Sequence, residues 1–179
     1  MPGTVSPARR PGPLLTPGPA SAVRPATDDD LRAIRAIGLA TWPATYAFAG
    51  DAYVDHGLTT WWSIDALRAN LRDTHMVVAV TAQGAVTGVG NLDLRRFPPV
   101  IRKLYVHPDR HGRGVGTALL DALIERAGNR RVRLECLDGN EPAARFYALR
   151  GFTEVGRENA VQPGWPGTVW LERSGRRRD

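Results

Sequence analysis

A glycine-rich turn between a short strand and an amphipathic helix is the feature that most constrains this fold. Residues 100–106 form a strand-like run that ends before Pro108, and apolar residues recur at helical spacing from residue 115 until Gly128 supplies a stop. Three alternating glycines occupy the turn between them: Gly112, Gly114 and Gly116. We therefore expect a strand, a glycine-rich loop and a helix in succession.

Glycines allow a backbone to turn several N–H groups toward one point, and a helix start adds partial positive charge there. Such a nest binds phosphate or pyrophosphate. The alternative is that the glycines only permit a tight turn. Three of them alternating at a helix start favour a phosphate site.

The rest of the chain predicts a mixed α/β fold. A short strand begins at Val23, a first helix runs from Leu31 and should end or kink at Pro43, a second helix starts near Ile64, and another lies within 142–150. The strand-like runs are 76–80, 85–94, 100–106, 132–136, 152–155 and 168–171. The resulting order is β α α β β β α β α β β, without an internal repeat.

Both ends of the chain are expected to lie outside a single domain of residues 22–172. Residues 1–21 hold six of the fourteen prolines, which predicts a disordered tail or a start placed too early. Residues 173–179 carry four arginines and should form a basic tail. Because these two ends hold most of the net charge of +6, the nearly neutral body argues against a nucleic-acid-binding face.

The cysteine, histidine and apolar content of the chain indicates its cellular compartment and whether it binds a metal. Cys136 is the single cysteine and permits no internal disulfide, which suits a reducing cytoplasm; its place among alternating apolar residues favours packing over a nucleophilic role. No apolar run is long enough to span a membrane. The pair Arg9-Arg10 suggests twin-arginine export, but nearby prolines interrupt the apolar helix that export requires. The histidines have no ligand spacing with Cys136, so we expect no metal.

Four segments coincide in order along the chain: Leu-Tyr-Val-His-Pro at 104–108, His-Gly-Arg-Gly-Val-Gly at 111–116, Leu-Glu-Cys at 134–136, and 140–152 with its Asn, Phe-Tyr and Gly-Phe. Together they resemble the GNAT superfamily of N-acetyltransferases. The matching family motifs are the fourth strand, the pyrophosphate loop Gln/Arg-x-x-Gly-x-Gly/Ala, the Leu-Glu-Val of the fifth strand, and the Asn-x-x-Ala…Phe-Tyr…Gly-Phe segment.

This resemblance implies a mixed, mostly antiparallel central sheet flanked by helices, with acetyl-CoA as cosubstrate. The cofactor-binding residues that it implies are Leu104, Tyr105, Val106, His111, Gly112, Arg113, Gly114, Val115, Gly116, Thr117 and Asn140. Asn140 would hold a cofactor amide or a water, or would only cap the following helix. The sequence departs from the family pattern at two places. His111 replaces the usual Gln or Arg, and Arg102-Lys103 lie where many members have an acid that acts as the base.

Acetyl transfer to an amine requires a neutral amine, a polarised thioester carbonyl and a proton for the departing thiolate. The resemblance points to Tyr147 as the acid that protonates the thiolate, the alternative being a core tyrosine beside Phe146. Glu135 is the candidate base, because it resembles an acid of the ribosomal-protein acetyltransferase branch. It could instead be a surface acid paired with Arg133, leaving water or Asp93 as the base.

The aromatic segment 42–62, broken by Pro43, Gly50 and Gly57, is expected to be irregular. Most of its rings should pack in the core, yet it is the best candidate for an acceptor wall. The wall residues would be Trp42, Tyr46 and Tyr53. The basic residues at 95–96 and 102–103 could favour an acceptor that carries a carboxylate, although exposed arginines are more often solvated.

These features predict direct transfer of an acetyl group from acetyl-CoA to a primary amine of a small molecule or peptide in a ternary complex. A Rossmann nucleotide site is a weaker alternative, because the third glycine of its fingerprint is absent. A non-catalytic acyl-CoA-binding module on the same fold remains the other alternative. We expect no nucleic-acid or membrane partner, and a homodimer would follow the family's habit.

Overall fold

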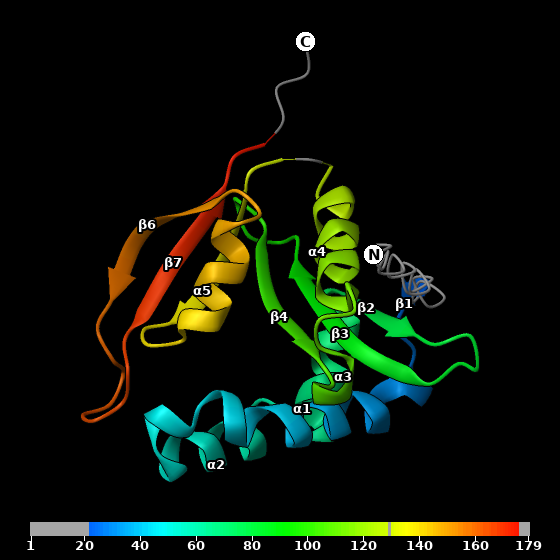
Figure 1. Cartoon of the computed structure of the whole chain (residues 1–179), viewed down its shortest axis with the longest axis horizontal. Helices are drawn as coiled ribbons and strands as arrows, with labels where there is room; N and C mark the ends of the chain where they lie inside the picture. Colours follow the sequence, from blue (N-terminus) through cyan, green and yellow to red (C-terminus); the bar gives the residue numbers. More distant parts are fainter. Residues whose placement is uncertain (1–21, 129, 176–179) are drawn as a thin grey trace, which may run out of the picture.

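One seven-stranded sheet runs through the centre of the molecule, with the strand order β1-β2-β3-β4-β5-β7-β6 (Figure 1). This computed structural model describes residues 22–128 and 130–175. The strands are β1 (Ala22–Pro25), β2 (His75–Val80), β3 (Val86–Asp93), β4 (Val100–Val106), β5 (Val132–Leu137), β6 (Phe152–Glu158) and β7 (Thr168–Arg173). All neighbours pair antiparallel except β4 and β5, which are parallel. The predicted mixed, mostly antiparallel sheet is confirmed.

Helices cover both faces of this sheet, and each face has its own core. The helices are α1 (Leu31–Thr45), α2 (Asp51–Thr60), α3 (Ile64–Asp73), α4 (Val115–Arg126) and α5 (Glu141–Ala148). Figure 1 shows α1, α2 and α3 gathered on one side and α4 and α5 on the other. Leu119 and Leu123 of α4 are buried with Leu134 in one core, whereas Ile34 of α1 and Trp62 are buried in the second.

The prediction of irregular structure across 42–62 is wrong for residues 42–45 and 51–60, which are helical. Helix α1 continues through Pro43 to Thr45, and α2 occupies residues 51–60. Pro43 lies in the last turn of α1, so it shortens the helix only slightly. Gly57, which resembled a helix breaker, is instead a close-packing position, because the ring of Trp42 occupies the space where its Cβ would lie.

The expected tails lie largely outside the part of the chain that the structure describes. Residues 1–21 and 176–179 lie outside the described residues. Arg173, which we expected to begin the basic tail, is instead the last residue of β7, where it pairs with Val132 and Phe152. No helix of the described ranges is long and apolar enough to cross a membrane.

The sheet opens at β4 and β5. These strands pair only at Val100–Arg133 and Ile101–Leu134, near the beginning of both strands. On the other side of β4, the pairing with β3 shifts by one residue, so that Arg102 is an extra residue on β4. Such a bulge bends a strand and increases its local twist. Beyond it β4 pairs with β3 alone, and its edge toward β5 is open.

Candidate active site

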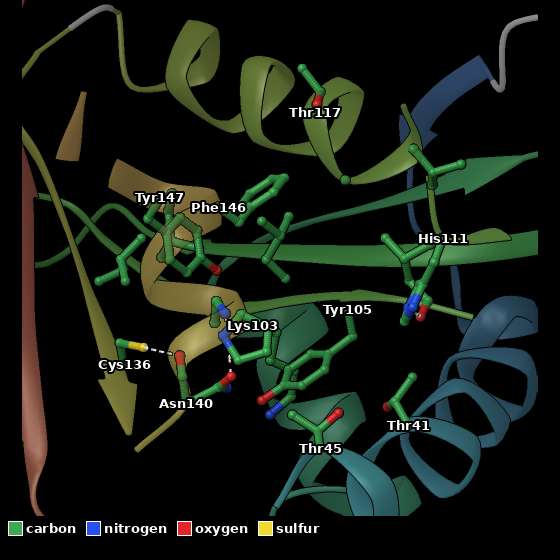
Figure 2. A pocket seen from close by; sticks show the side chains of 18 of the residues that line it. Thr41, Thr45, Lys103, Tyr105, His111, Thr117, Cys136, Asn140, Phe146 and Tyr147 are labelled. Atoms are coloured by element: carbon green, nitrogen blue, oxygen red, sulfur yellow. Dashed lines mark hydrogen bonds between the residues drawn. The ribbon is translucent and has the colours of Figure 1, made fainter. Parts of the chain in front are cut away.

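A cavity of about 530 Å³ lies where β4 and β5 separate. Its lining comes from α1, β4, the glycine loop, the start of α4, β5, and α5 with the turn after it. Figure 2 shows Thr117 of α4 and Tyr147 of α5 on one side of this cavity and Thr41 and Thr45 of α1 on the other. Segments far apart in the sequence therefore meet at the opening of the sheet.

The glycine loop borders the cavity, and two of its glycines adopt the left-handed backbone conformation. Gly112 has φ of 71° and Gly114 has φ of 78°, a region that side chains disfavour. Gly114 is the N-cap of α4, and no side chain caps this helix. The first N–H groups of a helix have no partner within it, and here they lie beside the cavity together with the positive end of the helix dipole. This arrangement suits an anion such as a diphosphate.

His111 folds back onto β4. Its Nε2 lies 2.9 Å from the backbone oxygen of Val106, so the ring closes the loop at the edge of the cavity that it lines. Of the predicted cofactor-binding residues, only Arg113 lies outside the lining, and it is exposed. The structure therefore gathers the others around one space.

Tyr147 is held in place by aromatic neighbours on both sides. Its ring centroid lies 5.2 Å from that of Phe146 and 5.6 Å from that of Phe152, and both contacts are edge-on. Its hydroxyl points into the cavity (Figure 2). Burial raises the pKa of Tyr147 above the ordinary value, and Tyr46 and Cys136 add to the rise. The phenol is therefore protonated near neutral pH and can donate its proton.

Cys136 and Asn140 lie together at the β5 side of the cavity (Figure 2). Burial, with smaller effects of Glu141 and Asp138, raises the pKa of the Cys136 thiol to about 11, so it is not a thiolate at neutral pH. The side-chain oxygen of Asn140 accepts a hydrogen bond of 3.3 Å from the backbone N–H of Ala143. The predicted cap of α5 is thus present.

Glu135 has a different partner from the one expected. Its carboxylate accepts a hydrogen bond of 2.7 Å from Arg102, on the facing strand β4. Arg133, the partner suggested by the sequence, pairs with Glu172 instead. The bulge at Arg102 explains the difference, because it displaces this arginine from the regular register of β4.

The three residues predicted for the acceptor wall do not all reach the cavity. Tyr46 lines the cavity, and its hydroxyl lies 2.9 Å from that of Tyr105. Trp42 and Tyr53 do not line it, because they stack on each other at 5.8 Å within the second core. Both rings pack against Tyr46 on the side away from the cavity. Burial raises the pKa of both Tyr46 and Tyr105, so the pair is protonated at neutral pH.

Several lining residues were missed by the sequence analysis. Thr41 and Thr45 lie one turn apart on α1, and Arg150 follows α5. The guanidinium of Arg150 lies 3.7 Å from the ring centroid of Phe146 and also donates to the hydroxyl of Thr117. In the sequence, the spacing of the two threonines by one helical turn was the one feature that could have indicated them. Nothing local indicates that Arg150 reaches α4. Among the described residues, no group of His, Cys, Asp and Glu is placed to hold a metal ion.

The comparisons with known proteins agree with this architecture. A sequence model described as the acetyltransferase (GNAT) family matches residues 33–152. The crystal structure of a GCN5-related N-acetyltransferase from Rhodopseudomonas palustris has a TM-score of 0.74 at 28% identity, covering 91% of this chain and 99% of that one. A PaiA N-acetyltransferase from Thermoplasma acidophilum, solved with coenzyme A, has a TM-score of 0.71 at 19% identity, covering 86% and 98%.

Curated relatives are similar over shorter stretches. An uncharacterized N-acetyltransferase of Methanocaldococcus jannaschii is 38% identical over 80 residues, which are 43% of this chain and 33% of that protein. An uncharacterized protein of Mycobacterium leprae is 31% identical over 117 residues, which are 63% of this chain and 33% of that protein. The chain thus spans about a third of the length of the curated relatives it matches.

Proposed function

This chain belongs to the GNAT acetyltransferase family, and we propose that it transfers the acetyl group of acetyl-CoA to a primary amine by direct attack in a ternary complex. The proposal rests on one observation. The glycine loop with the start of α4, and the hydroxyl of Tyr147, lie along a single cavity between separated strands. One long molecule with a diphosphate at one end and a thioester at the other would contact both.

The residues present fit the coenzyme. The backbone N–H groups of 112–117 would hold the diphosphate. The open edge of β4 at 104–106, which has no β5 partner and where only the oxygen of Val106 is taken by His111, would offer peptide groups to the amides of the pantetheine arm. Asn140 also lines this part of the cavity. Bound there, acetyl-CoA supplies a thioester carbonyl for an amine to attack.

Tyr147 acts as the general acid in this proposal. As the amide bond forms and the C–S bond breaks, its phenol gives a proton to the departing sulfur, and the phenolate regains one from the acylated nitrogen through water. Burial keeps the Tyr147 proton in place until then. The same apolar surroundings destabilise a free thiolate, which favours proton transfer to it. The raised pKa of the Cys136 thiol supports direct transfer over an acyl-cysteine intermediate.

Glu135 is the proposed base, and its ion pair with Arg102 determines the position of its carboxylate in the cavity. The pair fixes the carboxylate at the edge of the cavity while leaving it partly exposed, at 42% of the side chain. Such a group can take the proton of an incoming ammonium through a water. Acceptor wall residues in the proposal are Tyr46, Thr41 and Thr45, with Trp42 and Tyr53 behind them.

The test is an assay of CoA release from acetyl-CoA across a panel of primary amines and peptides. The proposal expects acetylation of at least one amine, confirmed by the mass of the product. Binding of CoA without acyl transfer to any amine would favour the non-catalytic module instead. Absence of CoA binding would overturn both.

A further inference from the structure

Lys103 projects from β4 at the point where the sheet opens. It lies two residues after Ile101, the last residue of β4 paired with β5, and next to the bulge at Arg102. Its Nζ lies 5.1 Å from the ring centroid of Trp62, and the ring of Tyr105 lies 5.0 Å from the same ring. Lys103 and Tyr105 therefore share the side of the cavity that faces α1, opposite the glycine loop and Tyr147.

This ammonium has no anionic partner within the described ranges. Glu135 is the one carboxylate that the described residues contribute to the cavity lining, and it is paired with Arg102. Burial, and secondly the charge of Arg102, lower the pKa of Lys103 to about 8. A half-buried charge without an anionic partner carries a desolvation cost, and an anion placed beside it would offset part of that cost.

We propose, resting on the acetyltransferase function above, that Lys103 binds a carboxylate of the acceptor, and that the acceptor is a small amine with a carboxylate a few bonds from its nitrogen, such as an α-amino acid. The carboxylate would accept a hydrogen bond from Nζ, while Trp62 holds the cation from the other side.

The charges around Lys103 also suit the chemistry of such an acceptor. With Arg102 beside it, Lys103 makes this side of the cavity unfavourable for an ammonium, which lowers the pKa of an amine bound there and favours its neutral, nucleophilic form. A carboxylate on the same molecule offsets the repulsion on binding. A polycationic amine has no such compensation, because the described lining contains no cluster of acids.

The kinetic test compares matched acceptors. We expect kcat/KM for L-amino acids to exceed that for the corresponding amino acid amides by roughly tenfold to a hundredfold, as for a hydrogen bond to a charged group. This preference runs against the supply of neutral amine, because the less basic amides hold a larger neutral fraction at the same pH. Lys103→Met should reduce the ratio of acid to amide toward one, and Lys103→Arg should restore most of it. Equal kcat/KM for acids and amides in the wild type would overturn the proposal.

A binding measurement separates this proposal from the function on which it rests. Calorimetry with the CoA-saturated protein compares an N-acetyl amino acid with its amide, and needs no turnover. Tighter binding of the acid that is lost in Lys103→Met supports the anion site, even if no amine is acetylated. Equal binding of acid and amide overturns it, even if transfer to other amines is observed. Unchanged thermal unfolding of Lys103→Met verifies that this variant is folded.

Discussion

Arg102 and Glu135 join β4 and β5 at the base of the gap between them, through an ion pair of 2.7 Å. The two strands pair through their backbones just below this contact and not above it. The pair therefore bridges the base of the opening, while its partly exposed carboxylate lies at the edge of the cavity. This position gives Glu135 a structural role, in bridging β4 and β5, and a proposed chemical role as the base. Substitutions can separate the two roles.

Replacing Glu135 by Gln should lower kcat by roughly 10²- to 10⁴-fold, because it removes the proposed base while keeping shape and hydrogen-bonding capacity. The free energy of unfolding should change by less than about 1 kcal/mol, since the ion pair is partly exposed. Steady-state kinetics over a range of pH and urea unfolding measure the two effects. A variant that retains the wild-type rate and pH profile would place the base elsewhere.

Replacing Tyr147 by Phe should lower kcat by roughly 10²- to 10⁴-fold with little change in the Kd for CoA. The ring remains, so its contacts with Phe146 and Phe152 are preserved and only the proton donor is lost. Tyr53→Phe is the matched control, because that phenol lies in the second core and outside the cavity lining. An equal loss of activity in both variants would contradict the assignment of Tyr147.

Gly57→Ala should destabilise the protein by about 2 kcal/mol. Alanine gains about 1 kcal/mol in an open helix, but overpacking a core costs roughly 1–3 kcal/mol. The added Cβ would meet the ring of Trp42, which is buried on all sides at 4% exposure and cannot swing away, so we expect the upper end of that cost. Gly156→Ala, where nothing lies within 4 Å, is the control and should be neutral or slightly stabilising in urea unfolding. Equal stability of the two variants would contradict this packing.

Asp30 predicts a dependence of stability on pH. Its carboxylate accepts hydrogen bonds from Arg24 at 2.7 and 2.8 Å and from the N–H of Thr27 at 2.8 Å. These bonds, led by that of Arg24, lower the pKa of Asp30 below its usual value of 3.8. The stabilisation is therefore present above the unfolded-state pKa and is lost as the pH falls through the lower, folded-state pKa.

Urea unfolding of the wild type and Arg24→Gln at several pH values measures this effect. The variant should be less stable at neutral pH, and the difference should shrink as the pH falls below 4, since the carboxyl is then protonated in both proteins. Arg68→Gln, which removes pairs with the exposed Asp28 and Asp65, should leave the acid transition unchanged. A difference for Arg24→Gln that is the same at every pH would contradict the prediction.

Local patterns predicted the parts of this structure that depend on local geometry. Gly112 and Gly114 adopt positive φ, and the helix after them begins at Val115. Strand β5 was readable from its alternation, because Val132, Leu134 and Cys136 are buried and the residues between them are not. These features are set by residues that are close in sequence.

What the sequence could not predict depends on contacts between distant residues. Gly57 resembles a breaker unless the position of Trp42 is known, and an aromatic segment does not distinguish a cavity wall from the packing behind it. The pairing of Glu135 with Arg102 follows from a bulge that shifts register within the sheet. Composition alone named Lys103 only as one of several basic residues that could favour a carboxylate-bearing acceptor; the fold places it in the cavity lining, without an anionic partner among the described residues.

The most direct measurement is a crystal structure of the protein grown with CoA. The account predicts the diphosphate on the backbone N–H groups of 112–117, the pantetheine arm between β4 and β5, and the sulfur within hydrogen-bond reach of the Tyr147 hydroxyl. A coenzyme bound with its diphosphate away from this loop, or with its sulfur remote from Tyr147, would contradict it.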